Sequence, residues 1–241
     1  YFYKIIKKFE SFFYNKASGI VCVSKNISDK INLDKIQLVH TNFASIDLIK
    51  KKYLYKNKII RNNKSLNLLY VGTLGLSHEF QIIIDKICYA KKLTMTIVGE
   101  GLQKSYINSY IKSKNIVNIF IDDYTNSHIK LANYYFNSDF CLILLKNIEI
   151  FKSVIPSKLF ELAFLEKIII YFGPKNEASD LIKLYDIGFC AHNENDLFNI
   201  LDNLDHFYID DTKYKKNFEK FNRDFNSKLI ALKYIDDIGK L

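Results

Sequence analysis

The sequence predicts an α/β fold in which a Rossmann-like parallel sheet carries helices on both faces. From residue 66 to residue 204, near-continuous apolar runs alternate with segments whose apolar residues recur at helical spacing. Strands of a parallel sheet are apolar throughout because helices bury both of their faces. In addition, five of the eight glycines follow predicted strands, where the backbone of an open parallel sheet comes close to a ligand.

The first 64 residues are predicted to form a separate end piece and linker. The expected elements are a helix, a strand, a short helix and a second strand, at residues 1–16, 19–24, 25–32 and 36–40. Apolar side chains from Ile5 to Phe13 share one face of the first helix. The polar, Lys-rich stretch 44–64 marks a change of composition and is the candidate linker. Because Tyr1 stands in the middle of a helical pattern, we expect an upstream portion to be absent.

The main predicted domain covers residues 65–205. Its expected strands span residues 66–71, 93–98, 117–121, 140–145, 167–172 and 189–191. The expected helices span residues 77–88, 102–113, 127–137, a segment after Ser157, 177–185 and 194–204. Residues 206–241 are polar and Lys-rich and predict one or two carboxyl-terminal helices.

The formal net charge of +9 favours anionic partners, which include nucleotides, nucleic acid and acidic membrane surfaces. Heavy use of Lys, Asn and Ile is also what an AT-rich genome imposes, so the charge alone does not select a partner. Aromatic residues fall on predicted core faces and do not alternate with basic residues, which argues against a stacking surface for nucleic acid. Nucleic acid is therefore not an expected partner.

The cysteines and histidines show no pattern typical of a metal site. Cys22, Cys88, Cys141 and Cys190 each lie in an apolar run, and no two have metal-type or redox spacing. The five histidines also lack such spacing. With no signal peptide and no apolar run of bilayer length, we expect a cytoplasmic protein with reduced thiols.

The most informative stretch runs from Pro156 to Glu161. Pro156 ends an extended segment, and Ser157 is predicted to cap the following helix. Lys158 lies in the first turn, and Glu161 lies one turn on, on roughly the same face. The helix N-terminus suits a phosphate, and the carboxylate suits the two hydroxyls of a ribose. We therefore predict a nucleotide clamp. The alternatives are that Lys158 or a backbone amide satisfies Glu161, and that Lys158 is a solvated surface lysine.

Two glycine-containing loops follow predicted strands. Gly72, Thr73 and Gly75 lie in the first loop, and Gly99 and Glu100 lie in the second. Each loop is a candidate for contact with the phosphates, sugar or base of a nucleotide, and a tight turn at a strand end is the alternative explanation. The first loop lacks the third glycine and acidic partner of a dinucleotide motif, and the chain has no Gly-Lys-Ser or Gly-Lys-Thr sequence. NAD binding is therefore disfavoured and a Walker-type P-loop is excluded.

Two further side chains are weaker candidates. Glu177 begins the helix after Gly173 and Pro174, and it is either a ligand contact or a favourable first-turn acid. His78 lies near the first glycine loop, where a surface or capping role is the simpler interpretation.

Four motifs occur along the chain in a recognisable order and spacing: Val71 to Gly75, Ile97 to Gly101, Ile155 to Glu161, and Gly173 with Glu177. Together they resemble the carboxyl-terminal half of family 4 (group 1) glycosyltransferases, in the branch with a Pro-Ser-Lys motif found among bacterial surface-polysaccharide transferases. The stretch from Ser18 to Asn42 resembles the end of that family's first domain. The resemblance implies the GT-B architecture, with this chain as the second, donor-binding domain and a remnant of the first.

The resemblance also implies roles for single residues. Glu161 would bind the donor ribose, and Ser157 and Lys158 would bind the diphosphate, with Lys158 and Glu161 as the catalytic residues. The other implied donor contacts are Gly72, Thr73 and Gly75 near the phosphates or sugar, Gly99 and Glu100 near the base, and Glu177. Ser153 stands where many family members carry an additional glutamate for the donor sugar, and the family's basic residue after the first glycine loop is not evident.

The implied reaction is retaining transfer of a hexose or N-acetylhexosamine. The donor would be a nucleotide-diphosphate sugar, UDP-linked, and the acceptor a lipid-linked or polysaccharide glycan of the cell surface. The helix N-terminus and Lys158 would stabilise the departing diphosphate, with no metal or other cofactor. A lipid-linked acceptor implies a location at the inner face of the cell membrane. The alternatives are a donor-binding half that needs a separate chain with the first domain, and a GT-B sugar-nucleotide epimerase.

Overall fold

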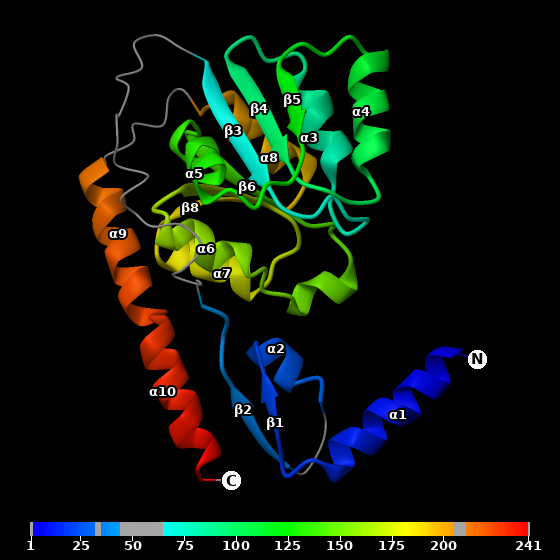
Figure 1. Cartoon of the computed structure of the whole chain (residues 1–241), viewed down its shortest axis with the longest axis vertical. Helices are drawn as coiled ribbons and strands as arrows, with labels where there is room; N and C mark the ends of the chain where they lie inside the picture. The colour runs from blue at the N-terminus through cyan, green and yellow to red at the C-terminus, as the bar shows by residue number, and fades with distance from the viewer. Residues whose placement is uncertain (1, 32–34, 44–64, 205–210, 241) are drawn as a thin grey trace.

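The computed structural model describes residues 2–31, 35–43, 65–204 and 211–240 (Figure 1). Within these ranges the strands form one six-stranded sheet and one two-stranded sheet. The six-stranded sheet and its helices make up the upper body in Figure 1, and the two-stranded sheet lies below it. The candidate linker at 44–64 lies outside the described residues.

The strand pairs of the larger sheet are all parallel, in the order β5-β4-β3-β6-β7-β8. The strands are β3 Leu66–Val71, β4 Leu93–Val98, β5 Ile119–Asp122, β6 Phe140–Leu144, β7 Ile168–Phe172 and β8 Gly188–Ala191. Numbered along the chain from β3, this is the strand order of the doubly wound nucleotide-binding fold, 3-2-1-4-5-6. The predicted fold class is therefore confirmed, and the strand order reverses between β3 and β6.

Helices cover both faces of this sheet. The helices between and after the strands are α3 Phe80–Ile87, α4 Lys104–Ser113, α5 His128–Phe136, α6 Lys158–Phe164, α7 Glu177–Leu184 and α8 Glu194–Asp202. Lys86 of α3 binds Asp202 of α8 at 2.7 Å, which places these two helices on one face. Tyr135 of α5 donates to Glu161 of α6, which places those two on the other face. Figure 1 shows α5, α6 and α7 grouped together, apart from α3 and α4.

The central strands explain why the sequence shows continuous apolar runs. Every residue of β6 and of β7 is buried, as expected for parallel strands with helices on both faces. From α3, Ile83 and Ile84 add fully buried side chains. Each such side chain contributes roughly 1.5–3 kcal/mol relative to an exposed one. The loops at the carboxyl ends of these strands therefore begin from firmly packed positions.

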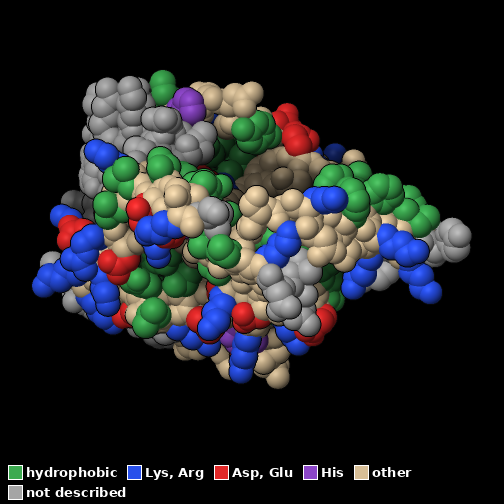
Figure 2. Space-filling view, turned by 90° about the horizontal axis from the view of Figure 1, so that it is seen from below, with side chains coloured by type: hydrophobic (Ala, Val, Ile, Leu, Met, Phe, Trp, Pro, Cys, Tyr) green, Lys and Arg blue, Asp and Glu red, His purple; other side chains and the backbone are tan. Residues whose placement is uncertain are grey.

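The end piece consists of α1 Phe2–Lys16, β1 Gly19–Cys22, α2 Lys25–Ser28 and β2 Ile36–Val39. β1 and β2 are parallel, and Ser24 caps α2 by accepting a hydrogen bond from the Ile27 amide at 3.2 Å. The apolar side chains of α1 and several of β1 and β2 are exposed, namely Phe2, Ile5, Ile6, Phe9, Phe12, Phe13, Val21 and Ile36. Figure 2 shows hydrophobic side chains along one flank of the projecting helix and lysines along another.

Two helices close the described chain, α9 Asp211–Asp224 and α10 Ser227–Ile238. Asn222 of α9 donates to the Ala163 carbonyl of α6 at 3.2 Å. From α10, Asp237 lies 3.2 Å from Nε2 of the buried His40, and the Tyr234 ring packs edge-on against His40 at 5.1 Å. The carboxyl-terminal helices thus run along both bodies (Figure 1) and contact the residue that follows β2.

The structure corrects two expected helix starts. Ser77 does not open α3, which begins at Phe80, because a turn closed by the His78 amide and the Gly75 carbonyl takes up the intervening residues. Ser157 does not cap α6. Its backbone is already helical and its side chain makes no capping bond, whereas a capping residue needs an extended backbone.

Candidate functional site

The two glycine loops predicted to meet at one edge of the sheet lie against each other. The Leu74 amide donates to the Glu100 carbonyl at 2.8 Å. A Cβ atom on Gly99 would lie 1.9 Å from the Gly72 carbonyl oxygen, which is closer than any real contact. Gly99 is therefore required by the packing of one loop on the other. Packing between the two loops is a structural reason for Gly99 that the sequence did not reveal.

Gly75 differs from Gly99 because no close neighbour restricts it. A Cβ atom there would meet its nearest atoms at 3.7 Å, an ordinary contact distance. Thr73 beside it is exposed. The exposed Glu100 side chain shares Lys104 with Asp123. The predicted donor contacts in these loops thus divide into a packed pair, Gly72 with Gly99, the half-buried Gly75, and the exposed Thr73 and Glu100.

The loop after β6 joins the loop after β3 at the point where the strand order reverses. The Lys146 amide donates to the Ser77 carbonyl at 2.9 Å. In open α/β sheets, ligands bind at this reversal, outside the carboxyl ends of the strands. From Lys146 the chain passes through a short 3₁₀ turn, Glu149–Ser153, and enters α6. The Pro156–Glu161 stretch thus follows directly on a loop at the edge of the sheet where ligands bind in this fold class.

The start of α6 leaves polar groups available. The amides of Leu159 and Phe160 donate to the carbonyls of Pro156 and Ser157, at 3.0 and 3.1 Å. Within the described residues, the backbone N–H groups of Ser157 and Lys158 donate no hydrogen bond, and the Ser157 side chain is exposed. An anion at this position would meet two N–H donors and a hydroxyl.

Lys158 and Glu161 come together as predicted, with a third side chain that the sequence did not reveal. Lys158 Nζ lies 2.7 Å from Glu161 Oε2. The hydroxyl of Tyr135 donates to Glu161 Oε1 at 2.7 Å and lies 3.5 Å from Lys158 Nζ. Glu161 and Lys158 are 21% and 27% exposed, so the ion pair is half-buried and open on one side. In this structure Glu161 is thus satisfied by Lys158, the alternative stated from the sequence, and by Tyr135.

Tyr135 is completely buried in α5. Burial, and after it the negative charge of Glu161, raises the pKa of Tyr135 well above its ordinary value. The phenol therefore keeps its proton and acts as a donor to the carboxylate. In the sequence Tyr135 is one apolar position of a helical pattern, and no motif signals its hydroxyl.

Glu177 binds the end piece of the chain. Its carboxylate accepts hydrogen bonds from the amides of Asn26 and Lys25, at 2.7 and 3.4 Å. It thus caps the N-terminus of α2, where a negative charge is favourable. Next to this contact, Ser153 binds Lys30 through its hydroxyl at 3.1 Å and Ser24 through its carbonyl at 3.0 Å. Glu177 and Ser153 therefore join the end piece to the larger body.

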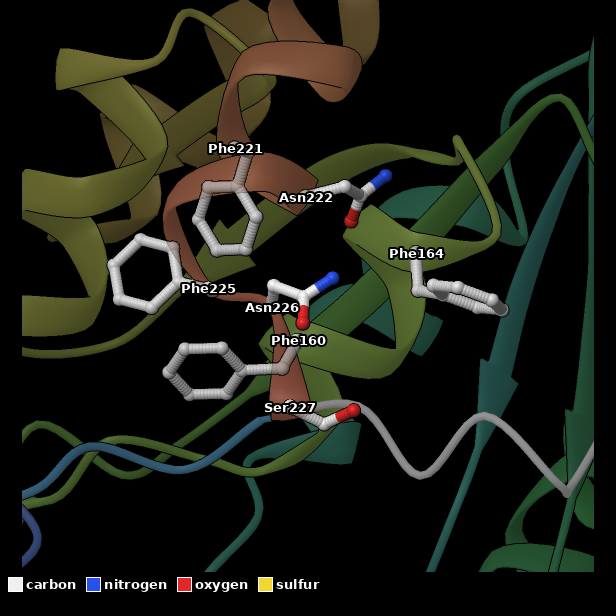
Figure 3. A pocket seen from close by; sticks show the side chains of 7 residues that line it. All are labelled: Phe160, Phe164, Phe221, Asn222, Phe225, Asn226 and Ser227. Atoms are coloured by element: carbon white, nitrogen blue, oxygen red, sulfur yellow. The ribbon is translucent and has the colours of Figure 1, made fainter. Parts of the chain in front are cut away.

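A separate apolar pocket of about 140 Å³ lies between α6 and the turn that joins α9 to α10 (Figure 3). Its lining residues are Phe160, Phe164, Phe221, Asn222, Phe225, Asn226 and Ser227. Phe160 and Phe225 pack edge-to-face at 5.3 Å. The pocket is smaller than typical ligand pockets, which measure about 300–1,000 Å³. Phe160 lines it, and the adjacent Glu161 lies on another face of α6, because neighbouring residues on a helix do not share a face. The pocket is thus distinct from the Lys158–Glu161 pair.

Metal ligation and membrane crossing find no support among the described residues. In the described part of the chain, no three His, Cys, Asp or Glu side chains are grouped as metal ligands. None of the helices that the structure describes has both the length and the apolar character to cross a membrane.

The fold resembles several solved structures. A mutant of Staphylococcus aureus TarM, in complex with fondaparinux, α-GlcNAc-glycerol and UDP, matches with a TM-score of 0.66 and 17% identity, over 92% of this chain and 44% of that one. HepE from Anabaena with UDP-glucose gives 0.70 and 14%, over 93% and 64%. The lipopolysaccharide outer core galactosyltransferase WaaB gives 0.67 and 15%, over 93% and 63%. No protein-family model and no curated protein matches the sequence.

These matches define the class of fold. The chain has an α/β fold with a parallel six-stranded sheet between layers of helices, and this fold matches the solved structures named above. It spans 44–64% of the length of the three chains compared, so it corresponds to a part of each. At identities of 14–17% the likeness concerns the fold alone.

Proposed function

We propose that this chain is the donor-binding part of a retaining glycosyltransferase of family 4, in its Pro-Ser-Lys branch. The donor is a UDP-linked hexose or N-acetylhexosamine, and the acceptor is a lipid-linked or polysaccharide glycan at the inner face of the cell membrane. The observation that carries the proposal is the half-exposed Lys158–Glu161 pair at the start of α6, in the element that follows the strand-order reversal. Solved structures of similar fold contain UDP or UDP-glucose.

Each group at this site has a distinct part in the proposed reaction. Glu161 accepts hydrogen bonds from the ribose hydroxyls, and Lys158 with the amides of Ser157 and Lys158 contacts the diphosphate. As the sugar leaves, negative charge develops on the diphosphate, and hydrogen-bond donors held at that position stabilise the charge. Thr73 and Gly75 line the approach to the phosphates or sugar. No metal or further cofactor enters the proposal.

We also propose that a further α/β domain covers the end piece and supplies the acceptor site. Two parallel strands alone are marginal in water, and parallel strands normally have both faces covered. On β1 and β2, however, Val21 and Ile36 are 39% and 52% exposed, and the apolar side chains of α1 are exposed as well. The domain would come from a longer form of this chain or from a separate chain.

A reaction of the chain with UDP-glucose distinguishes a chain that is active by itself, an epimerase, and a donor-binding part that needs the further domain. Release of UDP, measured with a coupled assay that reports phosphate, supports sugar transfer or hydrolysis of the donor as a side reaction. Appearance of a second UDP-sugar by NMR supports an epimerase instead. UDP binding without either product supports a donor-binding half that needs the further domain.

Lys158→Ala is expected to lower the affinity for UDP by about tenfold, because a charge-assisted hydrogen bond to phosphate is lost. The affinity for uridine, which has no phosphate, should change by less than about threefold on the same grounds. Isothermal titration calorimetry with both ligands measures the difference. Equal losses for uridine and UDP would argue against a phosphate contact.

A further inference from the structure

The carboxylate of Glu161 is held by two partners that differ in burial. Tyr135 approaches Oε1 from a completely buried position on α5. Lys158 approaches Oε2 from its own helix, three residues earlier, and is 27% exposed. One oxygen is therefore anchored from inside the protein, and the other is paired at the surface.

We propose that Tyr135 is a positioning residue for nucleotide binding, which holds Glu161 in place while Lys158 leaves the carboxylate for the incoming diphosphate. The inference rests on the proposed function and concerns how the same site changes from its unliganded to its liganded state. In this structure, the Lys158–Glu161 pair neutralises two partly buried charges. On binding, the ribose hydroxyls take the place of Lys158 at Glu161 Oε2.

The geometry favours the loss of the Lys158 contact with Glu161 over the loss of the Tyr135 contact. The Tyr135 hydroxyl has no water-facing position, because the residue is fully buried, and a buried donor that loses its acceptor is strongly destabilised. Lys158 ends a flexible four-carbon chain with three donors that re-orient freely. A diphosphate carries more negative charge than one carboxylate, and the attraction between charges grows with their size, so the diphosphate competes with Glu161 for the ammonium group. Tyr135 therefore remains at Glu161 while Lys158 moves.

The different roles of Tyr135 and Lys158 predict that their variants lose affinity for different parts of the nucleotide. Tyr135→Phe removes only the hydroxyl and should weaken uridine and UDP binding by about tenfold, since Glu161 loses its anchor, while pyrophosphate binding stays unchanged. Lys158→Ala should weaken pyrophosphate more than uridine. The matched control is Tyr134→Phe, which removes the neighbouring hydroxyl that donates to Asp122 at 2.6 Å and should leave all three affinities unchanged. Calorimetry with uridine, UDP and pyrophosphate gives the profiles, and thermal melting confirms that each variant is folded.

A crystal structure of the wild-type protein with UDP provides a readout that needs no variant. The proposal expects the Tyr135–Glu161 hydrogen bond to persist and the Lys158–Glu161 pair to open. A retained Lys158–Glu161 pair, or a Tyr135→Phe variant that binds uridine like the wild type or loses all three ligands equally, overturns the positioning role but not the proposed function. A wild-type protein that binds neither UDP nor pyrophosphate overturns both.

Discussion

Glu161→Ala is expected to lower the affinity for UDP by about 100-fold. The proposed site gives the ribose one strong acceptor, and two hydrogen bonds to a carboxylate are worth about 1.5–3 kcal/mol each. Since every 1.4 kcal/mol is a factor of ten, losing both bonds lowers the affinity by at least this amount. Calorimetric titration of UDP into the wild-type and variant proteins measures the change, and an unaltered dissociation constant would rule Glu161 out as the ribose ligand.

The same substitution also has a structural cost, because Glu161 has two hydrogen-bond partners within the protein. Its removal leaves the buried Tyr135 hydroxyl without an acceptor and Lys158 without a counter-charge. A buried donor without a partner costs about 1–3 kcal/mol, so urea unfolding should show a loss of this size. Asp236→Ala is a suitable control, because it breaks the exposed Asp236–Lys240 pair on α10 and should change neither UDP affinity nor stability appreciably.

The sequence predicted the strands of the larger body well, because the central strands are continuous apolar runs. Phe140–Leu144 and Ile168–Phe172 are apolar at every position, which only a strand covered on both faces requires, and both are central strands of the sheet. The polar segments were harder to place. The expected strand 117–121 begins two residues later, at Ile119, and the side chain of Asn118 before it binds the end of α3 and the start of β4.

The candidate site could be predicted only where its partners are close in sequence. Lys158 and Glu161 share a face of one helix, and helical spacing alone brings them together. Tyr135 reaches Glu161 across 26 residues, and Glu177 reaches Asn26 across 151 residues. Such contacts depend on how α5, α6 and α2 pack, which the local pattern does not encode. The contact of Glu177 with α2 was missed for this reason.

Gly99→Ala is expected to destabilise the protein by about 3 kcal/mol, at the upper end of the range for an overpacked core. The added Cβ would lie 1.9 Å from the Gly72 carbonyl oxygen. Backbone cannot rotate away as a long side chain can, so the loops after β3 and β4 must separate. That separation strains the Leu74–Glu100 and Gly72–Val98 hydrogen bonds that join them. Equilibrium unfolding in urea, followed by circular dichroism, measures the loss.

Gly75→Ala is the matched comparison, because it adds the same methyl group to the neighbouring loop without a clash. Its nearest atoms lie at 3.7 Å, so stability should change by less than about 0.5 kcal/mol, as for an ordinary surface substitution. A glycine that packing does not require is open to a role at the ligand, and a loss of UDP affinity in Gly75→Ala without a loss of stability would support one. Equal stability of the two variants would instead show that Gly99 is not required for loop packing.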